Sequence, residues 1–193
     1  MSEPHAAPSQ AREVLRFWFA DGGLRDEWFR KDESFDALIR ERFGTLVERA
    51  IEGGLLDWQD APDAALARIL LLDQFTRNIH RGTARAFAGD ALALAAARSM
   101  VSTGQDLALP PERRAFVYLP FEHAEDLVAQ DEAVRLFTAL AHQAPEMNGM
   151  LDYARRHRAV IARFGRFPHR NAALGRASTP EEAAFLQQPG SGF

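Results

Sequence analysis

The chain contains no cysteine. Disulfide bonds, thiolate nucleophiles and sulfur-ligated metal ions are therefore excluded, and any chemistry must come from oxygen and nitrogen groups. Lysine is nearly absent, since Lys31 is the only one, so arginine carries almost all of the positive charge. Long apolar runs are also missing, because the stretches 69–72 and 91–97 fall far short of the roughly 20 residues that cross a bilayer.

Common catalytic and binding motifs are missing as well. The sequence has no phosphate-binding glycine loop, no dinucleotide fingerprint, no His-Glu-x-x-His zinc helix, no calcium loop and no nucleophile elbow. These absences remove the most frequent enzyme classes, and the sequence predicts neither a metal ion nor a cofactor.

The composition is typical of one soluble globular domain. Of 193 residues, 47% are apolar and 26% are charged, which is too apolar for disorder and too interrupted by charge for a membrane protein. We expect a single domain over 1–193, with loosely ordered tails at 1–9 and 188–193. The net charge of −4 argues against binding to nucleic acid or to an anionic membrane. Residues 1–10 lack the apolar segment of a secretion signal, so a cytoplasmic location is expected.

Helical periodicity dominates the sequence. Apolar residues recur at three- and four-residue spacing, most clearly over 33–53, and no stretch alternates with the period of two that marks a strand. The segment 62–75 is expected to form the central helix, because its middle is apolar on every side. The sequence therefore predicts an all-α, single-domain, antiparallel array of about eight to ten helices without a fixed repeat.

Several residues mark where helices begin and end. Gly104 and Gly165 follow apolar periodic segments and predict helix ends. The segment 178–182, Ser-Thr-Pro-Glu-Glu, predicts a capping box that opens the last helix. Pro120 predicts a break or kink, with a new helical segment over 121–143.

A polar cluster follows the most apolar part of the sequence. If the helix continues, residues four apart meet, so that Asp73 faces Arg77 and Gln74 faces Asn78. One interpretation is a set of side-chain pairs that ends a core helix. The other is one wall of a polar pocket.

Three titratable side chains lie close together at His123, Glu125 and Asp126. An adjacent carboxylate raises the pKa of an imidazole and fixes its orientation, so His123 is a candidate for proton transfer. Metal binding and a solvated acidic face are the alternatives.

The segment 153–176 contains seven arginines, two histidines and no acidic residue. Phe164 and Phe167 alternate with the arginines, so burying the rings draws guanidinium groups toward the interior, where an unpaired charge costs several kcal/mol. Carboxylates from elsewhere in the chain or an anionic ligand must neutralise them. Pro168 favours a helix start beside Arg166 and Arg170, an arrangement that fits an anion. A clamp of internal carboxylates remains the alternative.

Together these segments resemble the bacterial domain-of-unknown-function family 924. The resemblance is carried by VLRFWF at 14–19, WF at 28–29, LLDQFTRN at 71–78, LPFEHAED at 119–126 and RFGRFPHRNAALGR at 163–176. It implies an all-α fold of the tetratricopeptide-like superfamily and no activity, because none is established for the family. The sequence departs from the family pattern at Thr76, where proline is frequent, and at Glu122, where an apolar residue is frequent.

The candidates for a functional site are the polar residues of these segments. They are Asp73, Gln74, Arg77, Asn78, His123, Glu125, Asp126, His157, Arg163, Arg166, His169, Arg170 and Asn171. One hypothesis is a small-molecule site, in which arginines hold a carboxylate or phosphate and His123, His169 or Glu125 transfers a proton. The other is a helical scaffold that binds a peptide or protein in a groove. Enzymatic activity and oligomeric state stay open.

Overall fold

A computed structural model describes residues 7–20, 28 and 31–192 of the chain. Within these ranges the fold consists of helices and connecting segments, and no strand occurs. The helices are α1 Ser9–Phe19, α2 Glu33–Ile51, α3 Pro62–Leu70, α4 Thr76–Ile79, α5 Asp90–Thr103, α6 Pro111–Glu122, α7 Leu127–Gln143, α8 Asn148–Phe164 and α9 Pro180–Leu186. Short 3-10 turns lie at Leu56–Asp60, Ala84–Phe87, Gln105–Ala108, Pro145–Met147 and Pro168–Arg170. The predicted all-α class is confirmed.

The two predicted tails are described only in part. Residues 1–6 and 193 lie outside the described residues. Helix α1 already begins at Ser9, and near the other end Ser191 is buried and donates a hydrogen bond to the carbonyl oxygen of Leu186.

None of the helices in the described ranges combines the length and the apolar content needed to cross a membrane.

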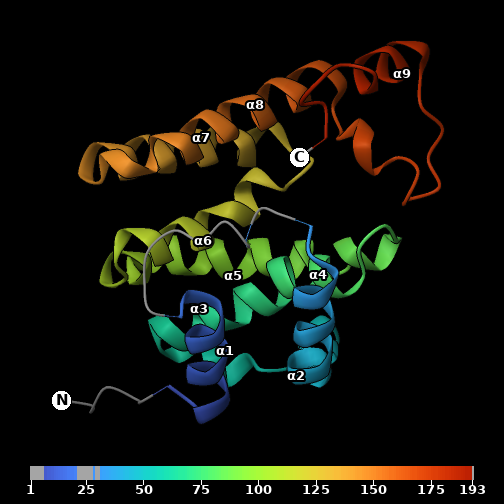
Figure 1. The fold of residues 1–193 in the computed structure, drawn as a ribbon. Helices are drawn as coiled ribbons and strands as arrows, with labels where there is room; N and C mark the ends of the chain where they lie inside the picture. Colours follow the sequence, from blue (N-terminus) through green and yellow to red (C-terminus); the bar gives the residue numbers. More distant parts are fainter. Residues whose placement is uncertain (1–6, 21–27, 29–30, 193) are drawn as a thin grey trace.

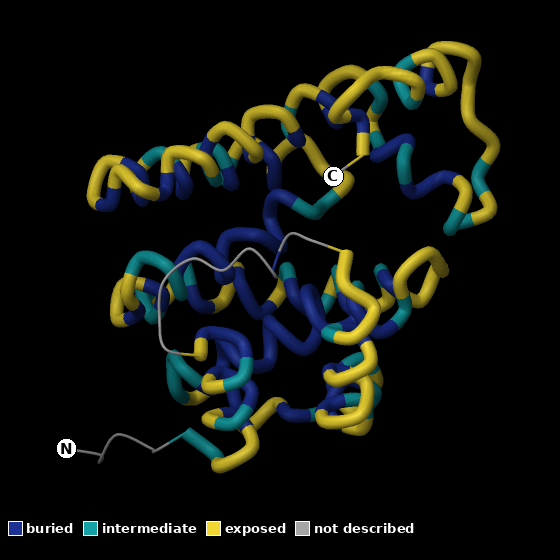
Figure 2. Tube along the Cα trace, in the orientation of Figure 1, coloured by how far each residue is buried: buried dark blue, intermediate teal, exposed yellow. Residues whose placement is uncertain are grey.

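The centre of the fold is one helical rod made of α3, a π-helical turn at Leu71–Phe75 and α4. Leu66, Leu70 and Phe75 have no exposed surface, and helices α1, α2, α5 and α6 pack around the rod (Figure 1). Figure 2 shows the buried chain concentrated in this region. Burying each large apolar side chain contributes roughly 1.5–3 kcal/mol. The predicted central helix is therefore confirmed.

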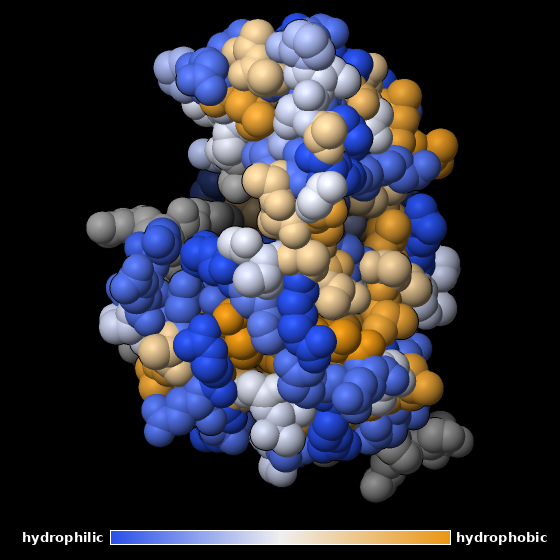
Figure 3. All heavy atoms as spheres, turned by 90° about the vertical axis from the view of Figure 1, so that its right-hand side faces the viewer, coloured by the Kyte–Doolittle hydropathy of each residue, from blue (hydrophilic) through white to orange (hydrophobic). Residues whose placement is uncertain are grey.

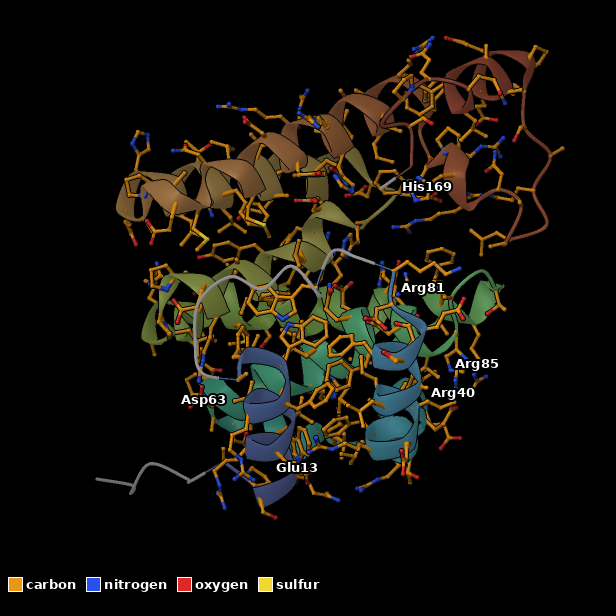
Figure 4. All side chains as sticks on the ribbon, in the orientation of Figure 1. Glu13, Arg40, Asp63, Arg81, Arg85 and His169 are labelled. Atoms are coloured by element: carbon orange, nitrogen blue, oxygen red, sulfur yellow. The ribbon has the colours of Figure 1, made fainter. Side chains whose placement is uncertain are left out.

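Helices α1–α6 form a body, and helices α7–α9 form a C-terminal layer above it in Figure 1. Helix α7 packs against α6 and α8, and α9 contacts the turn Pro168–Arg170. In Figure 3 the outline of the molecule is indented at the left where the layer meets the body. His169 lies at this junction (Figure 4).

Helix ends follow the sequence signals closely, with one exception. Gly104 and Gly165 follow α5 and α8 in left-handed conformations, with φ of 72° and 69°, and α9 opens with the predicted capping box. The break predicted as one possibility at Pro120 does not occur, since α6 continues through it to Glu122, and the next helix starts at Leu127 and not at 121. A proline inside a helix costs about 3 kcal/mol, and the complete burial of this part of α6 offsets that cost. The four residues 123–126 are thereby left as a non-helical segment beside the core.

The π-helical turn places one extra residue in the central rod. The backbone N–H and the hydroxyl of Thr76 both donate to the carbonyl oxygen of Leu71, the hydroxyl at 2.8 Å. The neighbouring carbonyl of Leu72 lies against Gly89, where an added Cβ atom would sit only 2.2 Å from the oxygen. This close approach brings the start of α5, at Asp90, next to Asp73 on the turn.

We expect Gly89→Ala to destabilise the protein by about 1–3 kcal/mol or more, because the new methyl group forces two backbone segments apart. Gly149→Ala in α8 is the matched control, since no atom lies within 4 Å of its added Cβ. Gly149→Ala is expected to raise the free energy of unfolding by at most about 1 kcal/mol, because alanine is the better helix former. Urea unfolding followed by circular dichroism measures both. Equal stability of the two variants would contradict the close packing at Gly89.

Candidate functional site

Five side chains from five segments of the chain form a closed ring of contacts, here called the charge ring. It consists of Asp73 on the π-helical turn, Arg77 on α4, Asp90 at the start of α5, His123 after α6, and Arg170. Asp73 pairs with Arg77 and His123, and Asp90 pairs with Arg77 and Arg170. Arg170 closes the ring by donating to the carbonyl oxygen of His123 at 3.0 Å. The two guanidinium groups and the two carboxylates balance in charge.

Asp73 is the most enclosed member of the charge ring, with 1% of its surface exposed. Its carboxylate oxygens accept hydrogen bonds from Gln74 at 2.6 Å and from Arg77 at 3.0 Å, and contact Nδ1 of His123 at 2.7 Å. Burial raises the pKa of this carboxyl group, but Arg77 and His123 outweigh burial and hold the pKa well below its usual range. Asp73 is therefore ionised at neutral pH.

Arg170 links the C-terminal layer to the body. Its guanidinium carbon lies 4.7 Å from the ring centroid of Phe87 and 4.5 Å from that of Phe167, and Nη1 lies 3.1 Å from Asp90. Burial and the neighbouring Arg77 lower the pKa of Arg170 to about 10, so the group stays charged at neutral pH. Its Nε atom is buried and has no hydrogen-bond partner among the described residues.

His123 is held in one orientation by Asp73. A carboxylate can only accept, so Nδ1 carries the proton and Nε2 presents its lone pair. Across 7–20, 28 and 31–192, no residue makes a hydrogen bond to that Nε2. Burial lowers the pKa of His123, and Arg77 and Arg170 lower it further, although Asp73 acts in the opposite direction. The imidazole is therefore a neutral base near pH 7, with 15% of its side chain exposed.

A second group of titratable side chains lies next to the charge ring. The ring centroids of His123 and His157 are 6.2 Å apart, and Nδ1 of His157 lies 3.0 Å from Oε1 of Glu122. Burial lowers the pKa of His157 to about 3 and that of His169 to about 4. Burial raises the pKa of Glu122 to about 8, with Asp73 adding to the effect. Near neutral pH all three groups are uncharged.

The other arginines of the segment 153–176 do not join the charge ring. Arg166 donates to both carboxylate oxygens of Glu182, at 2.6 and 2.8 Å, and Arg163 pairs with Glu181. Arg176 binds Glu125 through two hydrogen bonds. These pairs form the internal carboxylate clamp that the sequence left as an alternative, and they fasten the chain before and within α9.

Four further candidates have structural partners. Asn171 contacts Ser178 and Glu182 inside the carboxylate clamp, and Glu125 also accepts the backbone N–H of Phe167. Asp126 caps α7 by accepting the N–H of Ala129. Asn78 donates to Asp36 on α2, and Gln74 donates to Asp73. The structure thus brings together Asp73, Gln74, Arg77, His123, His157, His169 and Arg170.

The sequence analysis did not predict two residues of the site: Asp90 in the charge ring and Glu122 in the neighbouring group of titratable side chains. Asp90 stands at a helix start, where an acidic residue is favourable for the helix dipole alone, so no local pattern connects it with Arg77 and Arg170. Glu122 was passed over because an apolar residue is frequent there in the similar family. In the described ranges, no group of three or more His, Asp and Glu side chains is arranged to hold a metal ion.

Comparison with known proteins gives one family and one solved structure. A family model described as a bacterial protein of unknown function (DUF924) matches residues 14–190. The chain is also similar to the solved structure of a protein of unknown function from Agrobacterium tumefaciens, with 41% sequence identity and a TM-score of 0.84. That similarity covers 92% of this chain and 97% of the other. No curated protein matches the chain.

We expect Arg170→Ala to lower the free energy of unfolding by about 3–5 kcal/mol, because it removes one partner of a buried pair and the packing against two rings. Arg158→Ala is the control, since Arg158 pairs with Asp131 at the surface, where such pairs contribute about 0–1 kcal/mol. Urea unfolding at pH 7 compares the variants. A cost for Arg170→Ala as small as that of the control would mean that Arg170 is not held as described.

The contribution of His157 and His169 to stability is expected to fall as the pH drops below about 6.5, the pKa of an unfolded histidine. His157 and His169 have lowered pKa values in the folded chain. As the pH falls, these two histidines therefore bind protons in the unfolded chain before they do so in the folded chain. The stability that the two neutral histidines contribute is lost progressively as the pH approaches their pKa values in the folded chain. Each histidine is expected to cost about 2 kcal/mol between pH 7 and 5. Urea unfolding should show a shallower pH dependence in His157→Gln than in the wild type, with His142→Gln, which alters an exposed histidine, as the comparison variant.

Proposed function

The chain belongs to the bacterial family of unknown function DUF924, and we propose that its charge ring binds a small anionic ligand and that His123 accepts a proton in that site. The observation that carries the proposal is the pairing of Nδ1 of His123 with Asp73 at 2.7 Å, beside the buried guanidinium of Arg170 and the partly buried guanidinium of Arg77. This pairing leaves the basic Nε2 atom directed away from Asp73 and unused by the described fold.

The donors of the charge ring support an anionic ligand of small size. Asp90 is shared by Arg77 and Arg170, and Nε of Arg170 is a buried donor without a partner. A carboxylate or phosphate oxygen satisfies such a donor with a charge-assisted hydrogen bond. The side chains of Arg77 and Asp90 are each 21% exposed, so a small molecule reaches the ring more readily than a folded partner does.

The chemistry available at this site is general base catalysis. Nε2 of His123 takes a proton from a hydroxyl group or a water molecule, and Asp73 stabilises the imidazolium that results. The neighbouring guanidinium groups stabilise negative charge on the ligand. Hydrolysis and group transfer are the reaction classes that fit these groups.

A peptide or protein groove has less support. The large apolar side chains that are exposed in the described ranges, such as Leu38, Leu56, Leu107 and Val128, belong to separate elements. Binding of a peptide to one continuous apolar stripe would require them to lie together.

Anion binding is tested by an NMR titration of the histidine Cε1 protons, with and without inorganic phosphate or acetate. A bound anion favours the imidazolium, so the pKa of His123 is expected to rise. The exposed His142 is the reference for non-specific effects of ionic strength. Arg170→Lys keeps the charge but loses the Nε–H donor, and should reduce the rise several-fold. Arg158→Lys is the control. Equal responses of His123 and His142 to both anions would refute the proposal.

A further inference from the structure

Glu122 lies at the end of α6, immediately before His123, and only 3% of it is exposed. Its one ion-pair contact among the described residues is Nδ1 of His157 on α8, at 3.0 Å from Oε1. The same Nδ1 atom lies 2.9 Å from the backbone oxygen of Tyr153. Oε2 of Glu122 is buried and has no hydrogen-bond partner in the described part of the chain.

The contact with Tyr153 fixes the proton of His157. A carbonyl oxygen can only accept, so Nδ1 carries hydrogen and shares it between Tyr153 and Oε1 of Glu122. Burial lowers the pKa of His157 to about 3, so the ring is neutral. Glu122 therefore receives a hydrogen bond but no compensating positive charge from α8.

The other charge that acts on Glu122 is negative. Asp73, on the π-helical turn, is an ionised carboxylate that disfavours a second one nearby, while both arginines of the charge ring are engaged with Asp73 and Asp90. A buried carboxylate without a cation costs several kcal/mol, and protonation removes that cost. The pKa of Glu122, raised to about 8 by burial and then by Asp73, agrees with this reasoning.

We propose that Glu122 is a neutral carboxylic acid that donates its Oε2 proton, as a hydrogen bond, to an oxygen of the ligand bound at the charge ring. The proposal rests on the proposed function, and it adds an uncharged donor from the residue next to His123. Glu122 and His123 are adjacent in the chain, and His157 is near both, with Nδ1 3.0 Å from Oε1 of Glu122 and its ring centroid 6.2 Å from that of His123. The site then fits an oxyanion that accepts hydrogen bonds both from the neutral carboxylic acid of Glu122 and from a guanidinium group of the charge ring.

The test is infrared spectroscopy of the full chain, with Glu122→Gln used to assign the signal. The wild type should show the C=O band of a protonated carboxyl group at pH 6, absent from Glu122→Gln, and the band should disappear on titration through about pH 8. Glu146→Gln, which changes an exposed carboxylate, should leave the band in place. Inorganic phosphate is then added as the probe, and the band should shift.

Each outcome decides the proposal. Absence of the acid band at pH 6, or a large loss of thermal stability in Glu122→Gln, would show an ionised Glu122 paired with His157 and overturn it. A band that ignores phosphate while phosphate raises the pKa of His123 would overturn the donor role alone and leave the proposed function standing. If neither the band nor His123 responds to phosphate, both proposals fail.

Discussion

The structure depends on two guanidinium groups, one buried and one partly buried, and on the carboxylates that neutralise them. Arg170 comes from the segment before α9, Asp90 from the start of α5, and Arg77 and Asp73 from the central rod. A buried charge is tolerated only when its partners are in place, so the ring holds the C-terminal layer against the body in one position. The close approach of Gly89 to Leu72 and the π-helical turn also contribute to the charge ring, because they bring Asp90 and Asp73 within reach of Arg77.

The balance of charge also determines what the site can do. Because Asp73 and Asp90 neutralise both arginines, the histidines and Glu122 remain uncharged near neutral pH, each for reasons of burial. Glu122, whose pKa is raised to about 8, is neutral and close to its point of titration, and such a group is suited to moving protons, whereas a fully ionised cluster is suited only to holding the fold. Deviation from regular helix geometry at the π-helical turn, where such deviations often accompany function, agrees with this assignment.

Sequence reasoning recovered what local periodicity controls. The all-α class, the central rod, the capping box of α9 and the contact of Asp73 with Arg77 all follow from spacing along single helices. The rest depends on distant partners. Asp90 is thirteen positions from Arg77 and eighty from Arg170, and the π-helical turn is invisible to a pattern that assumes regular helix spacing. Arg166 was predicted to belong to the site because it lies in the arginine-rich segment 153–176. In the structure it forms an ion pair with Glu182 on α9 instead.

The central claim is that Asp73 holds His123 with its proton on Nδ1. Nitrogen-15 NMR of the histidine rings at neutral pH measures this directly, because the two tautomers give distinct shifts for Nδ1 and Nε2. The structure requires the Nδ1–H tautomer for His123, and its loss in Asp73→Asn, where Gln74 and Arg77 remain in place. An Nε2–H tautomer in the wild type, or a tautomer equilibrium like that of the exposed His142, would contradict the charge ring as described.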